Sequence, residues 1–257
     1  MRLLLTNDDG FQSPGITVLA DALRGLGHRV FMVAPAADNS GVSHSISFFK
    51  GLLKLAEIGS DSYSLDGTPA DCVAVALRGG IPELSMEGGL PPDAVVSGIN
   101  QGANLGTDIV YSGTAAAARQ GALCGIKSLA LSLVQGSAGR NGIWNWETAA
   151  AFAAERLEEM LGFWKPDTFV NVNMPNRGEP PLGFVRSFPS WRQYADKIEV
   201  YDAPDGNRYC IAHPERVASK PEPGSDWKAV EENSASVSGV YIHPVLHEDV
   251  GHYRYTV

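Results

Sequence analysis

The sequence predicts an α/β fold, in which helices cover both faces of a mostly parallel, Rossmann-like sheet. Short apolar runs alternate with segments whose apolar residues recur at helical spacing, through about residue 175. The chain opens with a strand over Leu3–Leu5, a helix over 14–26 and a strand over Val30–Val33, which together form a strand–helix–strand unit. Because such units place their helices on the sheet faces, their repetition predicts a parallel sheet that is covered on both sides.

The rest of the chain continues this alternation and then departs from it. Strands are expected over residues 94–96, 128–133 and 169–172, with helices over about 69–78, 114–123 and 146–162. Beyond Pro175, proline and glycine are frequent and the apolar runs are short, although residues 236–245 are typical of a strand or hairpin arm. We therefore expect two parts, an α/β core over residues 1–175 and a β-rich C-terminal extension over residues 176–257.

The composition is that of an ordinary soluble enzyme. Of the 257 residues, 44% are hydrophobic, yet no apolar run approaches the length that spans a bilayer, and the first residues lack the pattern of a signal peptide. The three cysteines lie far apart without zinc-type spacing, which favours reduced thiols. A net charge of −9 excludes a general affinity for nucleic acid polymers and anionic membranes. We expect a cytoplasmic protein in which an anionic substrate needs local compensation, for instance by a bound metal.

The first strand ends in two adjacent carboxylates and a turn glycine, Asp8, Asp9 and Gly10. Where a strand gives way to a turn, the alternation of side chains fails and both carboxylates can face one point. Open parallel sheets bind ligands at this edge, and paired carboxylates suit a hard divalent cation. The alternative is that both aspartates cap the next helix while Gly10 turns the chain.

Four polar loops are expected at this same edge of the sheet. They span residues 38–45, 66–71, 97–106 and 111–115, and the last leads into an alanine-rich helix. A helix N-terminus with flanking hydroxyls is a competent phosphate site, so Ser112, Gly113 and Thr114 are candidate phosphate contacts, with Asn104 as a further donor. Each loop also has a structural interpretation, in which its polar residues only cap helices, form turns or face solvent; these residues are Ser112, Thr114, Asn100, Asn104, Asp71, Asp108 and His44.

The motifs in these loops resemble those of the SurE family, the stationary-phase survival proteins. The matching stretches run in order over about residues 1–175; they are Thr6–Gly10, Ser40–Gly41, Gly67–Cys72, Ser97–Asn100 with Gly102 and Asn104, Tyr111–Thr114, and Asn171–Pro175. The sequence departs from the usual family pattern at Ala115, Gln120 and Gly239–Pro244. None of these departures affects a metal ligand that the resemblance implies.

The resemblance implies a metal-dependent 5′/3′-nucleotidase. In that family one divalent ion is held by the residues that correspond to Asp8, Asp9, Ser40 and Asn100. Such an ion, Mg²⁺ or Mn²⁺, would polarise the phosphate and lower the pKa of a bound water. Asp8 is the candidate for orienting or deprotonating that water. The substrates expected are nucleoside 5′- and 3′-monophosphates, with a tolerant base pocket.

Three other functions were weighed against this one. A response-regulator receiver is about half as long and needs a phospho-accepting aspartate and a lysine that are not found in suitable positions. A dinucleotide-binding oxidoreductase would need G-x-G-x-x-G in the first turn, which instead carries acids. A non-catalytic metal- or nucleotide-binding protein of the same fold stays open, and release of phosphate separates it from the enzyme.

The C-terminal part is expected to mediate assembly. Residues 176–257 have little periodic apolar content for a core of their own, and exposed strand edges are commonly covered by another chain, so we expect a homodimer or homotetramer. The segment Trp191–Tyr194 has two possible roles. Trp191 or Tyr194 stacks on a substrate base, or the segment packs the extension onto the sheet.

Overall fold

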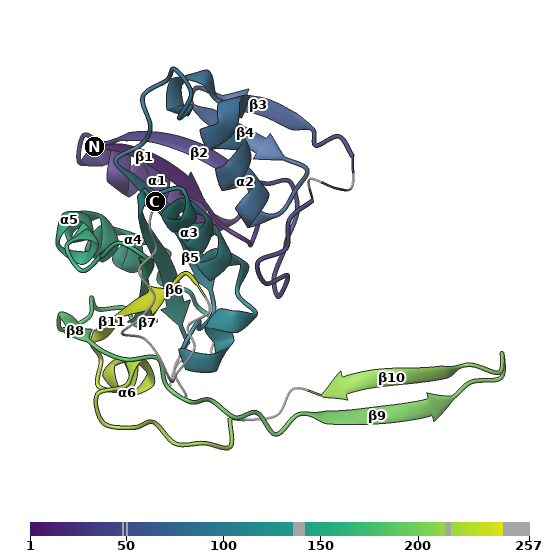
Figure 1. Cartoon of the computed structure of the whole chain (residues 1–257). Helices are drawn as coiled ribbons and strands as arrows, with labels where there is room; N and C mark the ends of the chain where they lie inside the picture. Colours follow the sequence, from purple (N-terminus) through teal and green to yellow (C-terminus); the bar gives the residue numbers. More distant parts are fainter. Residues whose placement is uncertain (48, 50, 136–141, 214–216, 244–257) are drawn as a thin grey trace, which may run out of the picture.

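The computed structural model describes residues 1–47, 49, 51–135, 142–213 and 217–243. They form one nine-stranded sheet and a separate two-stranded hairpin (Figure 1). The sheet has the order β3-β4-β2-β1-β5-β6-β7-β11-β8. Its strands are β1 (Arg2–Thr6), β2 (Arg29–Pro35), β3 (Leu55–Gly59), β4 (Ser62–Leu65), β5 (Ala94–Gln101), β6 (Lys127–Val134), β7 (Thr168–Pro175), β8 (Phe184–Arg186) and β11 (Ala235–Tyr241).

The middle of the sheet is parallel, as predicted. The pairs β2–β1, β1–β5, β5–β6 and β6–β7 are all parallel, and so is β4 with β2. Two strands run against their neighbours, because β3 joins β4 as a hairpin and β11 lies antiparallel to β7. The register between β5 and β6 shifts between Ser97 and Asn100, which marks an irregularity where β5 approaches the site.

Helices cover both faces of the sheet. They are α1 (Pro14–Gly25), α2 (Pro69–Val75) with the π-helical turn η2 (Ala76–Gly80), α3 (Gly113–Leu123), α4 (Trp146–Glu155), α5 (Leu157–Leu161) and α6 (Asp226–Glu231), with 3₁₀ turns η3 (Pro82–Leu84) and η4 (Gly106–Val110). The stretch 146–162 was expected to be one helix. It is two, because the backbone of Arg156 leaves the helical region at φ −111°.

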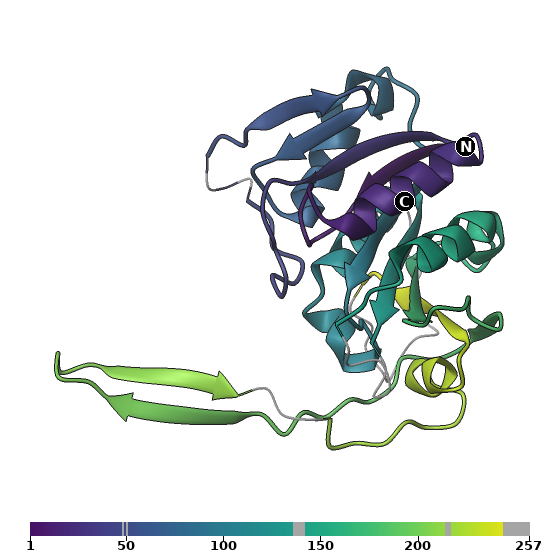
Figure 2. The same ribbon diagram turned by 180° about the vertical axis from the view of Figure 1, so that it is seen from behind.

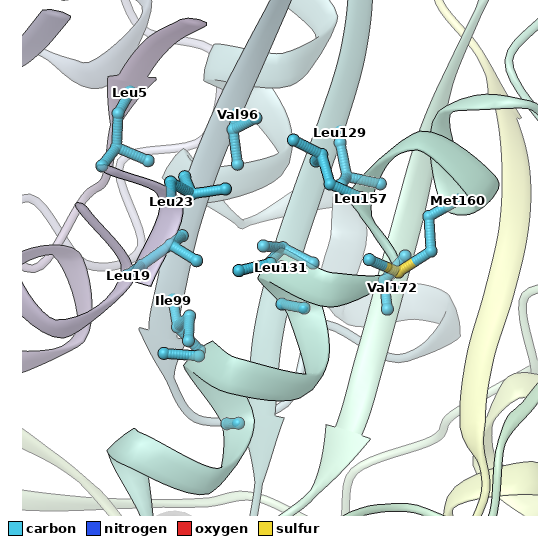
Figure 3. Close-up of a cluster of buried hydrophobic side chains, with 14 of the residues drawn as sticks. Leu5, Leu19, Leu23, Val96, Ile99, Leu129, Leu131, Leu157, Met160 and Val172 are labelled. Carbon is cyan, nitrogen blue, oxygen red and sulfur yellow. The ribbon is translucent and has the colours of Figure 1, made fainter. Parts of the chain in front are cut away.

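The alternation of side chains along the strands divides the core between the two faces. Leu3 and Leu5 of β1 pack with α1, α4 and α5, whereas Leu4 between them packs with α2. Figure 3 shows the first of these clusters, with Leu19 and Leu23 of α1 beside Leu5 and with Leu157 and Met160 of α5 over β6 and β7. Both faces of β1 are thereby buried, which explains its continuous apolar run.

The chain beyond Pro175 contributes both to the sheet and to a projecting arm. Strands β8 and β11 extend the nine-stranded sheet beyond β7. Strands β9 (Lys197–Asp202) and β10 (Arg208–His213) form an antiparallel hairpin that extends away from the rest of the molecule (Figures 1 and 2). The strand expected over 236–245 is present as β11, and its positions 244 and 245 lie outside the described residues. Within the described ranges, no helix has the length and apolarity required to cross a membrane.

Candidate active site

The candidate site lies where the strand order of the sheet reverses. The chain passes from β1 to β2 on one side and later to β5 on the other side of β1. In open parallel sheets, ligands bind outside the carboxyl ends of strands at such a point. Asp8 and Asp9 follow β1, Ser40 follows β2, and Asn100 lies near the end of β5. The topology therefore places all four predicted metal ligands at one edge.

The turn after β1 is fixed by short hydrogen bonds. Asn7, which is buried, donates from Nδ2 to the carbonyl of Gly10 at 2.8 Å. Asn39 donates its N–H to the carbonyl of Asp8 at 2.7 Å, which ties the loop after β2 to the same turn. Gly10 has a φ of +95°, and a Cβ there would come within 3.2 Å of the Ala37 backbone. Glycine is required at this position by both its conformation and its neighbour.

Asp8 is buried at the N-terminus of α3. Only 3% of its surface is exposed, and Thr114 donates to Oδ2 from its N–H at 3.0 Å and to Oδ1 from its hydroxyl. A helix N-terminus favours a negative charge through its free N–H groups and its dipole. Burial raises the pKa of the Asp8 carboxyl above its usual value, and the hydrogen bonds from Thr114 oppose that rise.

Asp9 lies against the end of β5. Its Oδ2 accepts the N–H of Gln101 at 3.0 Å. Burial, followed by repulsion from the Asp8 carboxylate, raises the pKa of Asp9 to about 6. In the part of the chain that the structure describes, no basic side chain forms an ion pair with Asp8 or Asp9. The two carboxylates thus meet without a compensating cation from the protein.

Ser40 and Asn100 supply neutral oxygens beside these acids. The hydroxyl and the N–H of Ser40 both donate to Asp38 Oδ1, at 2.7 and 2.8 Å. Asn100 donates from Nδ2 to the carbonyl of Gly102 at 3.1 Å, so Oδ1 is its remaining side-chain donor atom for a cation. The sequence predicted Asn100 in a loop after the strand; it belongs to β5, which continues to Gln101.

Asp8, Ser40 and Asn100 line a pocket of about 420 Å³, whereas Asp9 is not among its wall residues. This volume is within the usual range for small-molecule sites. The described residues of its wall are Asp8, Ser40, Gly41, Asn100, Gln101, Gly102, Ala103, Asn104, Asp108, Tyr111, Ser112, Tyr194 and Asp196. Three of these residues are acids, and none is a lysine, arginine or histidine. Among these described wall residues, an anionic ligand therefore meets no cationic side chain.

Asn104 is held in the pocket wall by a buried polar network. Its N–H donates to Asn173 Oδ1 at 2.9 Å, and its carbonyl accepts Nδ2 of Asn171 at 2.8 Å and Nδ2 of Asn173 at 3.0 Å. Its own Nδ2 donates to Ser132 Oγ at 2.8 Å, which leaves a second hydrogen on that nitrogen. The motif Asn171–Pro175 thus acts on the site through Asn104. No local sequence pattern shows this role, because Asn171 and Asn173 are 67 and 69 positions away from Asn104 in the sequence.

The start of α3 differs from the predicted phosphate cradle. Both donors of Thr114 are used by Asp8, and the N–H of Ala115 is used by the Ser112 hydroxyl at 3.0 Å. Thr114 is fully buried and is not part of the pocket wall, so its expected contact with phosphate is replaced here by a contact with Asp8. Ser112 is both a helix cap, as its structural interpretation had it, and a wall residue.

Three other polar residues from the sequence analysis have structural partners. Asp71 and Thr68 form a capping box at the start of α2, as expected of a first-turn acid. The imidazole of His44 lies 3.0 Å from Gln120 Oε1, and burial lowers its pKa, so it is not the solvated loop residue that was expected. Asp108 is paired with Arg192 and Tyr194, far along the chain.

Comparison with known proteins gives one consistent result. The family model described as survival protein SurE matches residues 3–195. Two proteins named 5′-nucleotidase SurE are similar to this chain: one from Methylocella silvestris is 38% identical over 93% of this chain and 92% of its own length, and one from Geobacter sulfurreducens is 41% identical over 94% and 88%. The crystal structure of the SurE protein from Aquifex aeolicus superimposes with a TM-score of 0.80 at 38% identity, covering 95% of each chain. The fold, the motifs and these relatives together show that this chain belongs to the SurE family of survival proteins.

Proposed function

We propose that this protein is a metal-dependent phosphomonoesterase that hydrolyses nucleoside 5′- and 3′-monophosphates to a nucleoside and phosphate. The observation that carries the proposal is the pair of adjacent carboxylates at the strand-order reversal, Asp8 and Asp9, of which Asp8 lines a pocket whose described wall residues include no basic side chain. The relatives named 5′-nucleotidase support the reaction class, a phosphoric monoester hydrolase.

The donor set fits one hard divalent cation. Asp8 and Asp9 supply two carboxylates that no cationic side chain neutralises among the described residues, and Ser40 and Asn100 supply a hydroxyl and an amide oxygen. Across the described ranges, no group of three or more His, Cys, Asp or Glu side chains is placed to hold a metal. An all-oxygen set with few carboxylates favours Mg²⁺ or Mn²⁺ over zinc. Such an ion would polarise the phosphoryl group and lower the pKa of a bound water.

The residues of the chain then have separate tasks. Asp8, held at the start of α3 by Thr114, orients the attacking water and accepts its proton. Asn104 and Ser112, which line the pocket, hold the phosphate oxygens together with the N–H of Gly113, which begins α3 next to the wall residue Ser112, while Thr114 acts through Asp8. The water oxygen bonds to phosphorus, the phosphorus–oxygen bond to the nucleoside breaks, and the nucleoside oxygen takes up a proton.

The test is phosphate release by the purified protein with Mg²⁺, with Mn²⁺ and after chelation by EDTA. We expect turnover of purine and pyrimidine 5′- and 3′-monophosphates only with metal, with specificity constants within about a hundredfold of one another. Re-addition of metal should restore the activity that EDTA removes. Metal and nucleotide binding without release of phosphate would contradict the enzyme and support a non-catalytic binding protein.

We also propose that the C-terminal extension over residues 176–257 mediates assembly of a cytoplasmic homodimer or homotetramer through its projecting hairpin β9–β10, while β8 and β11 of the same stretch complete the sheet of the core over residues 1–175. The hairpin β9–β10 exposes apolar side chains along its whole length: Ile198, Val200, Tyr201, Tyr209 and Ile211. A second copy would cover them and the free strand edges. Light scattering at micromolar concentration should give at least twice the monomer mass, and a monomer mass would contradict the proposal.

A further inference from the structure

The pocket wall contains a second group of residues for which metal and phosphate chemistry has no use. Tyr111, Tyr194 and Asp108 belong to this group. At about 420 Å³, the pocket is much larger than a phosphate group needs. The group joins two distant parts of the chain, since Tyr111 precedes α3 and Tyr194 lies between β8 and β9. It therefore exists only in the folded protein.

The Asp108 side chain holds Tyr194 in place, whereas Tyr111 contacts Asp108 only through the main chain. The hydroxyl of Tyr194 donates to Asp108 Oδ1, and Arg192 Nη1 donates to Asp108 Oδ2. The N–H of Tyr111 donates to the backbone carbonyl of Asp108 at 3.0 Å. The side chains of Arg192 and Asp108 are only 11% and 13% exposed, so this ion pair is shielded from solvent. A shielded and charge-assisted contact fixes the tyrosine ring more firmly than an exposed one.

Besides its ion pair with Asp108, Arg192 packs against two aromatic rings and does not line the pocket. Its guanidinium carbon lies 5.4 Å from the centre of the Tyr194 ring and 5.1 Å from that of the Trp227 ring. The main-chain N–H of Arg192 donates to Thr107 Oγ1 at 3.0 Å. Arg192 therefore packs the segment onto the rest of the protein, in line with the packing interpretation, while Tyr194 lines the pocket; stacking on a base stays a prediction.

The Tyr194 hydroxyl is hydrogen-bonded to Asp108, but its ring is accessible to a ligand in the pocket. Tyr194 is 39% exposed and contributes to the pocket wall, as does the more exposed Tyr111. Trp191 is 75% exposed and does not contribute to this wall. An aromatic ring whose polar group is satisfied elsewhere offers a flat apolar surface, and such surfaces bind nucleobases by stacking.

We propose that Tyr194 and Tyr111 form the nucleoside subsite of this pocket, with Tyr194 stacking on the base and Asp108 as the positioning residue that orients it. The proposal rests on the proposed function, because the phosphate of the same nucleotide would occupy the Asp8 side of the pocket. Stacking accepts purine and pyrimidine bases alike, since every base has an aromatic face. Fixing the ring in advance lowers the entropy lost on binding.

The test compares AMP with ribose 5-phosphate, which carries the same phosphate and sugar but no base. In the wild-type protein, kcat/KM for AMP should exceed that for ribose 5-phosphate by about tenfold or more. Tyr194→Ala should raise KM for AMP about tenfold with little change in kcat, so that the preference for AMP is lost. Tyr194→Phe keeps the ring and should retain most of the preference. Equal losses in the Phe and Ala variants would assign the effect to the hydroxyl and overturn stacking.

Trp191→Ala is the matched control, since it removes an exposed aromatic side chain three residues away that does not line the pocket. Its preference for AMP should equal that of the wild type. A wild-type protein that does not distinguish the two substrates would overturn the proposal, as would a Tyr194→Ala variant with the wild-type preference.

Binding of adenosine, measured by calorimetry, separates the nucleoside subsite from the proposed reaction. If no phosphate is released but adenosine binds, and binds about tenfold more weakly to Tyr194→Ala, the subsite stands and the proposed reaction fails.

Discussion

Asp8→Asn should lower kcat/KM for nucleoside monophosphates by about 10³-fold or more, while the protein stays folded. The substitution removes the charge of a metal ligand and the group that accepts the proton of water. It keeps the shape of the side chain, so the amide oxygen can accept the Thr114 N–H and the amide nitrogen can donate to the Thr114 hydroxyl. Burial raises the pKa of Asp8, which means that the neutral amide costs less to bury than the carboxylate. In metal-free buffer, the melting temperature should therefore equal or exceed that of the wild type.

Asp21→Asn is the control for the change in charge. Asp21 lies on α1 with 73% of its side chain exposed, and it has a long contact of 3.9 Å to Arg24. The turnover of the Asp21→Asn variant should equal that of the wild type. Calorimetric titration with Mn²⁺ should show binding to this control and much weaker binding to Asp8→Asn. Unchanged turnover in Asp8→Asn would remove Asp8 from the reaction and with it the central part of the proposed function.

Gly113→Ala should lower kcat/KM about 100-fold and the free energy of unfolding by about 1–3 kcal/mol. A Cβ at Gly113 would lie 2.8 Å from Asp8 Cβ and 2.9 Å from Asp8 Oδ2. Because Asp8 is buried and held by Thr114, it has little room to move, and the carboxylate would be displaced relative to Asp9. Alanine is otherwise the better helix former, so any loss measures the contacts of the new Cβ, first with Asp8 and then with Pro69 Cγ at 3.2 Å.

Gly25→Ala serves as the matched helical glycine. It is exposed at the end of α1, and a Cβ there would meet nothing within 4 Å. This variant should unfold at the same or a higher denaturant concentration and keep wild-type turnover. A Gly113→Ala variant with wild-type activity and stability would show that the carboxylate site tolerates displacement, contrary to the geometry described above.

The parts of the fold that the sequence predicted well are those with a local signal. Helix α1 was expected over 14–26 and spans Pro14–Gly25, since proline at its first position and glycine at its end mark both limits. The apolar runs of β1 and β2 are continuous because both of their faces are buried. Strands β6 and β7 are buried as well, although Ser132 interrupts the apolar run of β6, and Asn171 and Asn173 that of β7. The hairpin β9–β10 had a signal that the prediction did not use, namely Asp205–Gly206 between two strands of alternating apolar residues.

The position of the site was also readable from the sequence, whereas the partners of its side chains were not. Consecutive strands of a parallel sheet end at the same edge, so polar residues placed after β1, β2 and β5 are near one another in any fold of this class. The contact between Thr114 and Asp8 spans 106 positions and depends on where α3 docks against β5 and β6. No local pattern encodes that docking.

The sequence by itself determined the order of β1, β2, β5, β6 and β7 with the helices between them, the edge at which the candidate site lies and the residue types available there, but it did not predict the hairpin β3–β4. These follow from hydrophobic periodicity and turn residues, which act over a few positions of the chain. Only the tertiary structure decided that the start of α3 holds Asp8 rather than lying open, that Asn171 and Asn173 fix Asn104, and that Tyr194 reaches the pocket from the chain beyond Pro175. The physical reason is that each of these contacts joins elements far apart in sequence, and their distances are set by the packing of the whole sheet and its helices.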